Sequence, residues 1–237
     1  MRVLLTDSVS LLTRFRVRDV SQVRITTLTP LGCVMIELAL GLVAACVAWA
    51  LSAFCAPLPA GLLSAALISS AWWWIHGADG LKSLILALES GSRSSSGSQT
   101  STYIRLSAFQ GFIIAKAACL GYLAANGQSL WLVAAAALGG ASFGQWLQPV
   151  DSSAEEPVPT PIVYGHWILA LVAAAIVGGC YGHFFAGLLC GGIIWLLMPF
   201  QRRLASLGLA PMQCAQLGQE LTETGTLLLG LLLLANR

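Results

Sequence analysis

Two ionisable residues three positions apart, His76 and Asp79, follow three consecutive tryptophans in this 237-residue sequence. On a continuing helix this spacing places both side chains on one face. A carboxylate beside an imidazole can bind a divalent cation and accept a proton from a reacting hydroxyl group. Arg93 and Arg105 follow in the same connection, and guanidinium groups bind phosphate oxygens. The segment predicts a site for a magnesium-bound diphosphate, or more simply a polar turn after an aromatic belt at a helix end.

Two further polar groups stand out. Gln213, Gln216 and Gln219 lead to Glu220 and Glu223, a pair on one helical face that could bind a cation or a sugar hydroxyl, or could form the wet first turn of the last apolar helix. Glu37 and Lys116 lie inside apolar segments, where a charge is costly and indicates function. Lys116 is expected either to extend to the membrane surface or to pair with Glu37. Glu37 could line a cavity.

The composition of the chain indicates that these residues are held by membrane helices. Hydrophobic residues make up 57% of the chain and charged residues 9%, against about 45–50% and about 25% in soluble domains. These values exclude a soluble globule, a disordered chain and a coiled coil, and they predict an all-α polytopic integral membrane protein in contact with lipid. The net charge of +2 is too weak to indicate a nucleic-acid partner.

Apolar windows bounded by charges and prolines predict six to seven transmembrane helices. They cover 31–54, 60–75, 106–125, 130–146, 162–178, 183–200 and a shorter window at 217–234. A cytoplasmic amino terminus places ten of the twelve Lys and Arg residues on the cytoplasmic side, in agreement with the positive-inside rule. We expect one membrane domain over 1–237, with a cytoplasmic segment at 1–30 and a cytoplasmic loop at 76–105 that carries the candidate site.

Short motifs occur in a particular order along nearly the whole chain. They are LLTRFRV at 11–17, TPLG at 29–32, HGADGL at 76–81, YIRLSAFQG at 103–111, RRL at 202–204 and AQLGQEL at 215–221. In type and order these segments resemble motifs of the membrane-embedded cobalamin synthases, also called adenosylcobinamide-GDP ribazoletransferases. No single segment is a strong motif, so the order carries the resemblance.

The resemblance implies an enzyme of the last stage of cobalamin biosynthesis. Such a transferase joins alpha-ribazole, or its 5′-phosphate, to adenosylcobinamide-GDP and yields adenosylcobalamin (5′-phosphate) and GMP. The resemblance also implies Mg²⁺ as cofactor, small-molecule substrates, and other enzymes of cobamide assembly as partners. The expected location is the inner (cytoplasmic) membrane, with the active face toward the cytoplasm.

The same resemblance implies roles for individual residues. The catalytic residues would be His76, Asp79 and Arg105, with Asp79 also a metal ligand, and the substrate-binding residues would be Arg93, Lys82, Glu220 and Glu223. The family's acidic motif continues with two more aspartates, whereas Asp79 is followed by Gly-Leu-Lys-Ser-Leu. Candidate replacement ligands are Glu37, Glu89, Glu220 and Glu223. Two alternatives therefore stay open: a catalytically impaired family member that serves as a corrinoid-binding membrane subunit, and a small transporter that uses Glu37 and Lys116.

Overall fold

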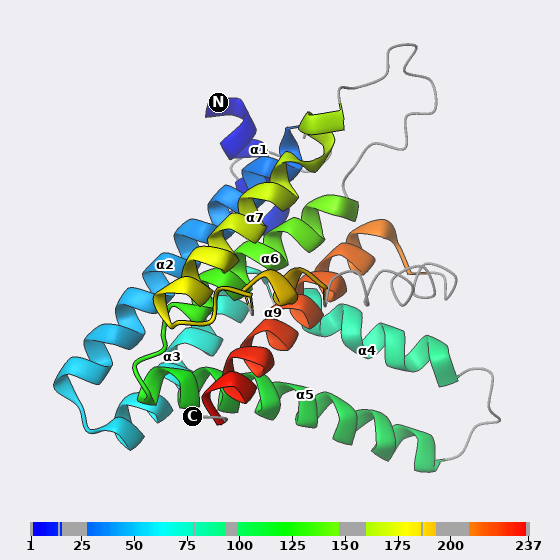
Figure 1. Ribbon diagram of the computed structural model, residues 1–237. Coiled ribbons are helices and arrows are strands. Elements are labelled where there is room, and N and C mark those ends of the chain that lie inside the picture. Colours follow the sequence, from blue (N-terminus) through cyan, green and yellow to red (C-terminus); the bar gives the residue numbers. More distant parts are fainter. Residues whose placement is uncertain are drawn as a thin grey trace.

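The computed structural model describes residues 2–13, 15, 28–77, 79–92, 99–146, 160–185, 187–192 and 209–235. The helices named within these ranges are α1 (Arg2–Leu12), α2 (Thr29–Phe54), α3 (Pro57–Ile75), α4 (Asp79–Ser92), α5 (Gln99–Ala125), α6 (Trp131–Trp146), α7 (Thr160–Cys180) and α9 (Pro211–Ala235). They form a bundle from which α4 and the first half of α5 extend in the same direction (Figure 1). The predicted all-α class is confirmed.

Three helices in the described part of the chain are long and apolar enough to cross a membrane. They are α2, α3 and the segment Leu106–Ala125 of α5, which agree with the predicted windows 31–54, 60–75 and 106–125. These helices indicate a multi-pass membrane protein. The apolar part of α7, Tyr164–Cys180, is shorter, and most of the predicted window 183–200 lies outside the described residues. The total of six to seven spans stays a prediction.

Within the predicted cytoplasmic loop at 76–105, residues 79–92 and 99–105 are helical, and the cytoplasmic position of this segment stays a prediction. Helix α4 begins at Asp79, and α5 begins at Gln99. Leu81, Leu84 and Leu88 recur at the spacing of one helical face. Leu84 packs with Ala87 against buried side chains of α9, so burial of this face stabilises a helix that lies against the bundle.

Helix α6 lies at the centre of the bundle and contacts α2, α7 and α9. All its residues from Trp131 to Gly144 are buried. Small residues allow its backbone to approach its neighbours closely, which is how membrane helices gain packing energy. A Cβ atom on Gly144 would lie 2.8 Å from the Cα of Pro30 in α2. The close contact between α2 and α6 therefore requires glycine at position 144.

The contact between α3 and α5 gives a first prediction, because Gly61 and Gly121 face each other there. A Cβ on Gly121 would lie 2.9 Å from the carbonyl oxygen of Gly61. We expect Gly121→Ala to push the helices apart and to lower the free energy of unfolding by about 1–3 kcal/mol. Chemical unfolding in detergent would measure this loss.

The matched control is Gly111→Ala in the same helix, where an added Cβ would meet nothing within 4 Å. Alanine favours a helix by up to about 1 kcal/mol over glycine, so this variant should be neutral or more stable. Equal unfolding midpoints for the two variants would contradict the close contact between α3 and α5.

Candidate functional site

Six polar side chains from four parts of the fold form one buried group, which we call the charged cluster. Its members are Glu37 of α2, His76 directly after α3, Lys116 of α5, and Gln219, Glu220 and Glu223 of α9. None of these side chains is more than 9% exposed. The sequence places them in three separate groups, and the structure brings the three groups together.

Lys116 forms the shortest contacts of the cluster. Its Nζ donates hydrogen bonds of 2.6 Å to Oε2 of Glu220 and 2.6 Å to Oε2 of Glu223. Both expectations for Lys116, extension to the surface and pairing with Glu37, are wrong because α9 packs against α5 and presents two carboxylates to it. The first-turn interpretation of Glu220 and Glu223 is also wrong, since both are buried in the interior of α9.

Glu37 instead pairs with His76. The ring Nε2 of His76 lies 2.7 Å from Oε1 of Glu37, and Nδ1 lies 2.8 Å from the carbonyl oxygen of Trp72. Because a carbonyl only accepts, Nδ1 carries a hydrogen, and a further proton lies between Nε2 and Oε1. Burial alone would lower the pKa of His76, but the charge of Glu37 and the hydrogen bond to it outweigh burial and raise the pKa to about 9.

Gln219 joins the two halves of the cluster. Its Nε2 donates to Oε1 of Glu37 at 2.9 Å and to Oε1 of Glu223 at 3.0 Å. The other oxygen of Glu37, Oε2, is buried and has no hydrogen-bond partner among the described residues. A buried carboxylate oxygen without a partner is costly, so Glu37 keeps unused capacity to accept a hydrogen bond or a proton.

Glycines of neighbouring helices make room for the glutamates. Glu223 lies against Gly139 and Glu37 against Gly140, both in α6, and Glu220 lies against Gly80 in α4. A Cβ on Gly139 would lie 2.7 Å from Cγ of Glu223. Gly80 lies in the segment HGADGL together with His76, whereas no signal in the sequence connects Gly139 or Gly140 to the cluster.

The other predicted site residues lie around the cluster or outside the described part of the chain. Asp79 begins α4 and directly precedes Gly80, which lies against Glu220. The side chains of Asp79, Glu89 and Arg105, and all of Arg93, are outside the described residues. Lys82 is exposed and donates from Nζ to the carbonyl oxygen of Gly77 at 3.2 Å. The structure therefore unites His76, Glu37, Glu220 and Glu223, and does not place Lys82 among them.

The described carboxylates do not fit the Mg²⁺ ion that the resemblance implies. Within the described ranges, no three His, Cys, Asp or Glu side chains are arranged to bind a metal ion. Glu220 and Glu223 face the ammonium group of Lys116, and Oε1 of Glu37 faces His76. A divalent cation needs several free oxygen ligands, and in this arrangement each of the three glutamates already has an oxygen engaged by Lys116 or His76.

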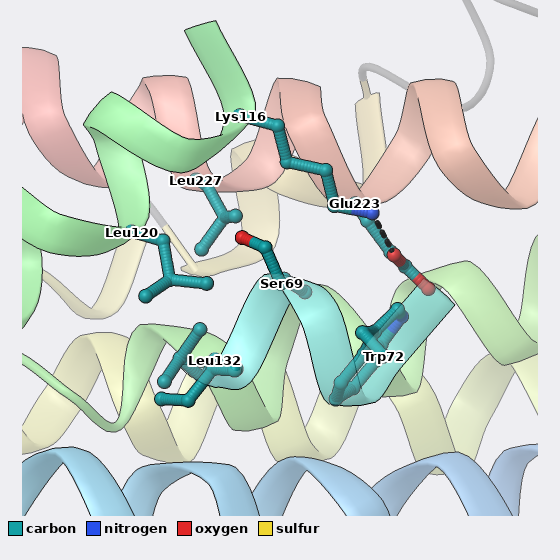
Figure 2. Close-up of a pocket in the computed structure, with 9 residues that line it drawn as sticks. Ser69, Trp72, Lys116, Leu120, Leu132, Glu223 and Leu227 are labelled. Carbon is teal, nitrogen blue, oxygen red and sulfur yellow. Dashed lines mark hydrogen bonds and ion pairs between the residues drawn. The ribbon is translucent and has the colours of Figure 1, made fainter. Parts of the chain in front are cut away.

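Hollows lie next to the charged cluster. One is lined partly by His76, Gly80 and Glu220. The other is lined by Lys116, Glu223, Ser69 and Trp72 together with leucine and other apolar side chains. Figure 2 shows Lys116 reaching from α5 toward Glu223, with Ser69 and Trp72 on the facing helix α3. No protein-family model, curated protein or solved structure matches this chain.

The pair of His76 and Glu37 predicts a dependence of stability on pH. The pKa of His76 is about 6.5 in an unfolded chain and about 9 here. A raised pKa contributes stability that is fully present below pH 6.5 and is lost as the pH rises through 9. We expect a loss on the order of 3 kcal/mol over this window, measured as the thermal midpoint in buffered detergent. Glu37→Gln should flatten the profile, and an unchanged slope in that variant would show that another group causes it.

Proposed function

We propose that this chain is a membrane transferase of the cobalamin synthase type. One observation supports this most: motif segments that lie far apart in the sequence meet at the charged cluster. His76 belongs to segment 76–81, and Gln219 and Glu220 belong to segment 215–221. Nε2 of Gln219 lies 3.4 Å from Nε2 of His76, and Gly80 lies against Glu220. The meeting of these segments around ionisable groups is what supports the proposal.

The proposed reaction is a phosphoryl transfer. A hydroxyl oxygen of alpha-ribazole, or of its 5′-phosphate, forms a bond to the phosphorus attached to the cobinamide side chain. The anhydride bond to the second phosphate breaks, and GMP leaves with the bonding electron pair. The hydroxyl proton needs an acceptor, and the phosphate charge needs positive groups around it.

The charged cluster offers groups for these tasks. Glu37 is the proposed proton acceptor, because its Oε2 has no partner among the described residues. His76 is a positioning residue, since both ring nitrogens are engaged and it orients Glu37 through Oε1. Arg105 and Arg93 are proposed to bind phosphate, and Asp79 is proposed as the ligand of any magnesium ion that arrives with the diphosphate. The substrates would approach from the cytoplasmic face of the inner membrane.

The test uses membranes that contain the protein, supplied with adenosylcobinamide-GDP, alpha-ribazole and Mg²⁺. Joined cobamide and GMP should appear in equal amounts, above the level in matched membranes without the protein. Asp79→Asn should remove most of the product. No product above the empty membranes would overturn the transferase proposal.

A second candidate function is a corrinoid-binding membrane subunit without transfer activity. The observation that favours it is the pairing of Glu220 and Glu223 with Lys116, which leaves these carboxylates unable to bind a metal. In the same membranes, saturable binding of adenosylcobinamide-GDP with no release of GMP would support this candidate. Product formation would exclude it.

A further inference from the structure

The ammonium group of Lys116 lies where a bridging cation would lie in a two-carboxylate site. Its Nζ is equidistant, at 2.6 Å, from one oxygen of Glu220 and one of Glu223. All three side chains are buried, so water screens these charges little. Two adjacent buried carboxylates repel each other unless a cation lies between them.

The surroundings of Lys116 also keep its ammonium group at the two carboxylates. The hollow lined by Lys116 is otherwise lined mainly by apolar side chains, among them Leu120, Leu132 and Leu227 (Figure 2). A lysine stem gains by lying along apolar surface, and an ammonium group that left the two carboxylates would enter this apolar hollow. The ammonium group of Lys116 belongs to the chain, so it cannot dissociate from the two carboxylates as a metal ion can.

We infer that Lys116 takes the place of a divalent cation between Glu220 and Glu223, so that this carboxylate pair is permanently closed to metals. Removal of the ammonium group should therefore turn the pair into a divalent-cation site.

This inference rests on the proposed function only where it concerns the magnesium ion of the transfer reaction. If the chain is a transferase, Glu220 and Glu223 do not hold its metal ion, and any magnesium ion must rely on Asp79 and the substrate phosphates. Metal binding can be measured without any turnover. A failure of the transfer assay would overturn the proposed function and leave the role of Lys116 standing.

The experiment measures Mn²⁺ binding to purified protein in detergent, from the loss of the free Mn²⁺ signal in electron paramagnetic resonance. Lys116→Met should bind one Mn²⁺ per chain more than the wild type, because the wild-type pair binds none. The double variant Lys116→Met with Glu223→Gln keeps one carboxylate and should lose the additional ion. Lys116→Arg keeps a cation in place and should bind no additional ion.

Two outcomes would overturn the inference. One is a folded Lys116→Met protein that binds no more Mn²⁺ than the wild type. The other is wild-type protein that binds Mn²⁺ and loses this binding on Glu223→Gln. This second comparison needs no variant of Lys116, so it still tests the inference if Lys116→Met does not fold. Wild-type binding that persists in Glu223→Gln but is lost in Asp79→Asn supports the inference, because the metal then lies elsewhere.

Discussion

Replacement of Lys116 by methionine will lower the free energy of unfolding by about 3–5 kcal/mol in metal-free buffer. The reason is that Glu220 and Glu223 would remain as two buried carboxylates without their counter-ion, and removal of one partner of a buried ion pair costs that much. Chemical unfolding in detergent measures the loss. Lys82→Met is the control, because Lys82 is exposed and an exposed charge contributes at most about 1 kcal/mol.

A second variant separates the effect of the lost counter-ion on the free energy of unfolding from the effect of lost packing. Adding Glu223→Gln to Lys116→Met removes one of the two buried carboxylates that have lost their counter-ion, so the double variant should be more stable than Lys116→Met alone. Two losses that simply add would show that Lys116 and Glu223 do not interact energetically. That result would contradict the ion pair seen at 2.6 Å.

The second large effect concerns transfer activity. We expect Glu37→Gln to lower the rate of cobamide formation by about 100-fold or more, since general acid–base catalysis contributes about 10²–10⁴-fold. The substitution keeps the shape of the side chain but removes the carboxylate that would accept the hydroxyl proton. The measurement is the initial rate of GMP release at equal amounts of folded protein.

Cys46→Ala provides the control for this variant, because Cys46 lies exposed on the same helix. Its rate should match that of the wild type. A Glu37→Gln protein that folds and transfers at the wild-type rate would remove Glu37 from the proposed chemistry and leave it a structural role only.

The sequence predicts well the three described helices that are long and apolar enough to cross a membrane. Windows 31–54, 60–75 and 106–125 agree with α2, α3 and the apolar part of α5, because uninterrupted apolar segments of this length are stable only as helices in lipid. Helix α4 is missed because it is short and amphipathic, with Lys82 exposed on its outer side, so it does not form an apolar window long enough to span a membrane. Without the neighbouring surface of α9, a short amphipathic segment is hard to distinguish from a loop.

The members of the charged cluster could be predicted, but their pairing could not. Glu37 and Lys116 stand out by type, since ionisable residues are rare in apolar segments. Which of them meet depends on which helices adjoin, and that is a property of tertiary packing. Helix α9 packs against α5, so Lys116 meets Glu220 and Glu223, while Glu37 is left to pair with His76.

The candidate site depends on one structural claim: Glu37 and His76, which are 39 residues apart, form one buried pair. Histidine-selective ¹⁵N NMR across pH tests this directly, with the signal assigned by its absence in His76→Gln. We expect the His76 imidazole to titrate near pH 9 in the wild type and to titrate well below that in Glu37→Gln. A wild-type pKa at or below 6.5, unchanged by Glu37→Gln, would contradict the pair and with it the charged cluster.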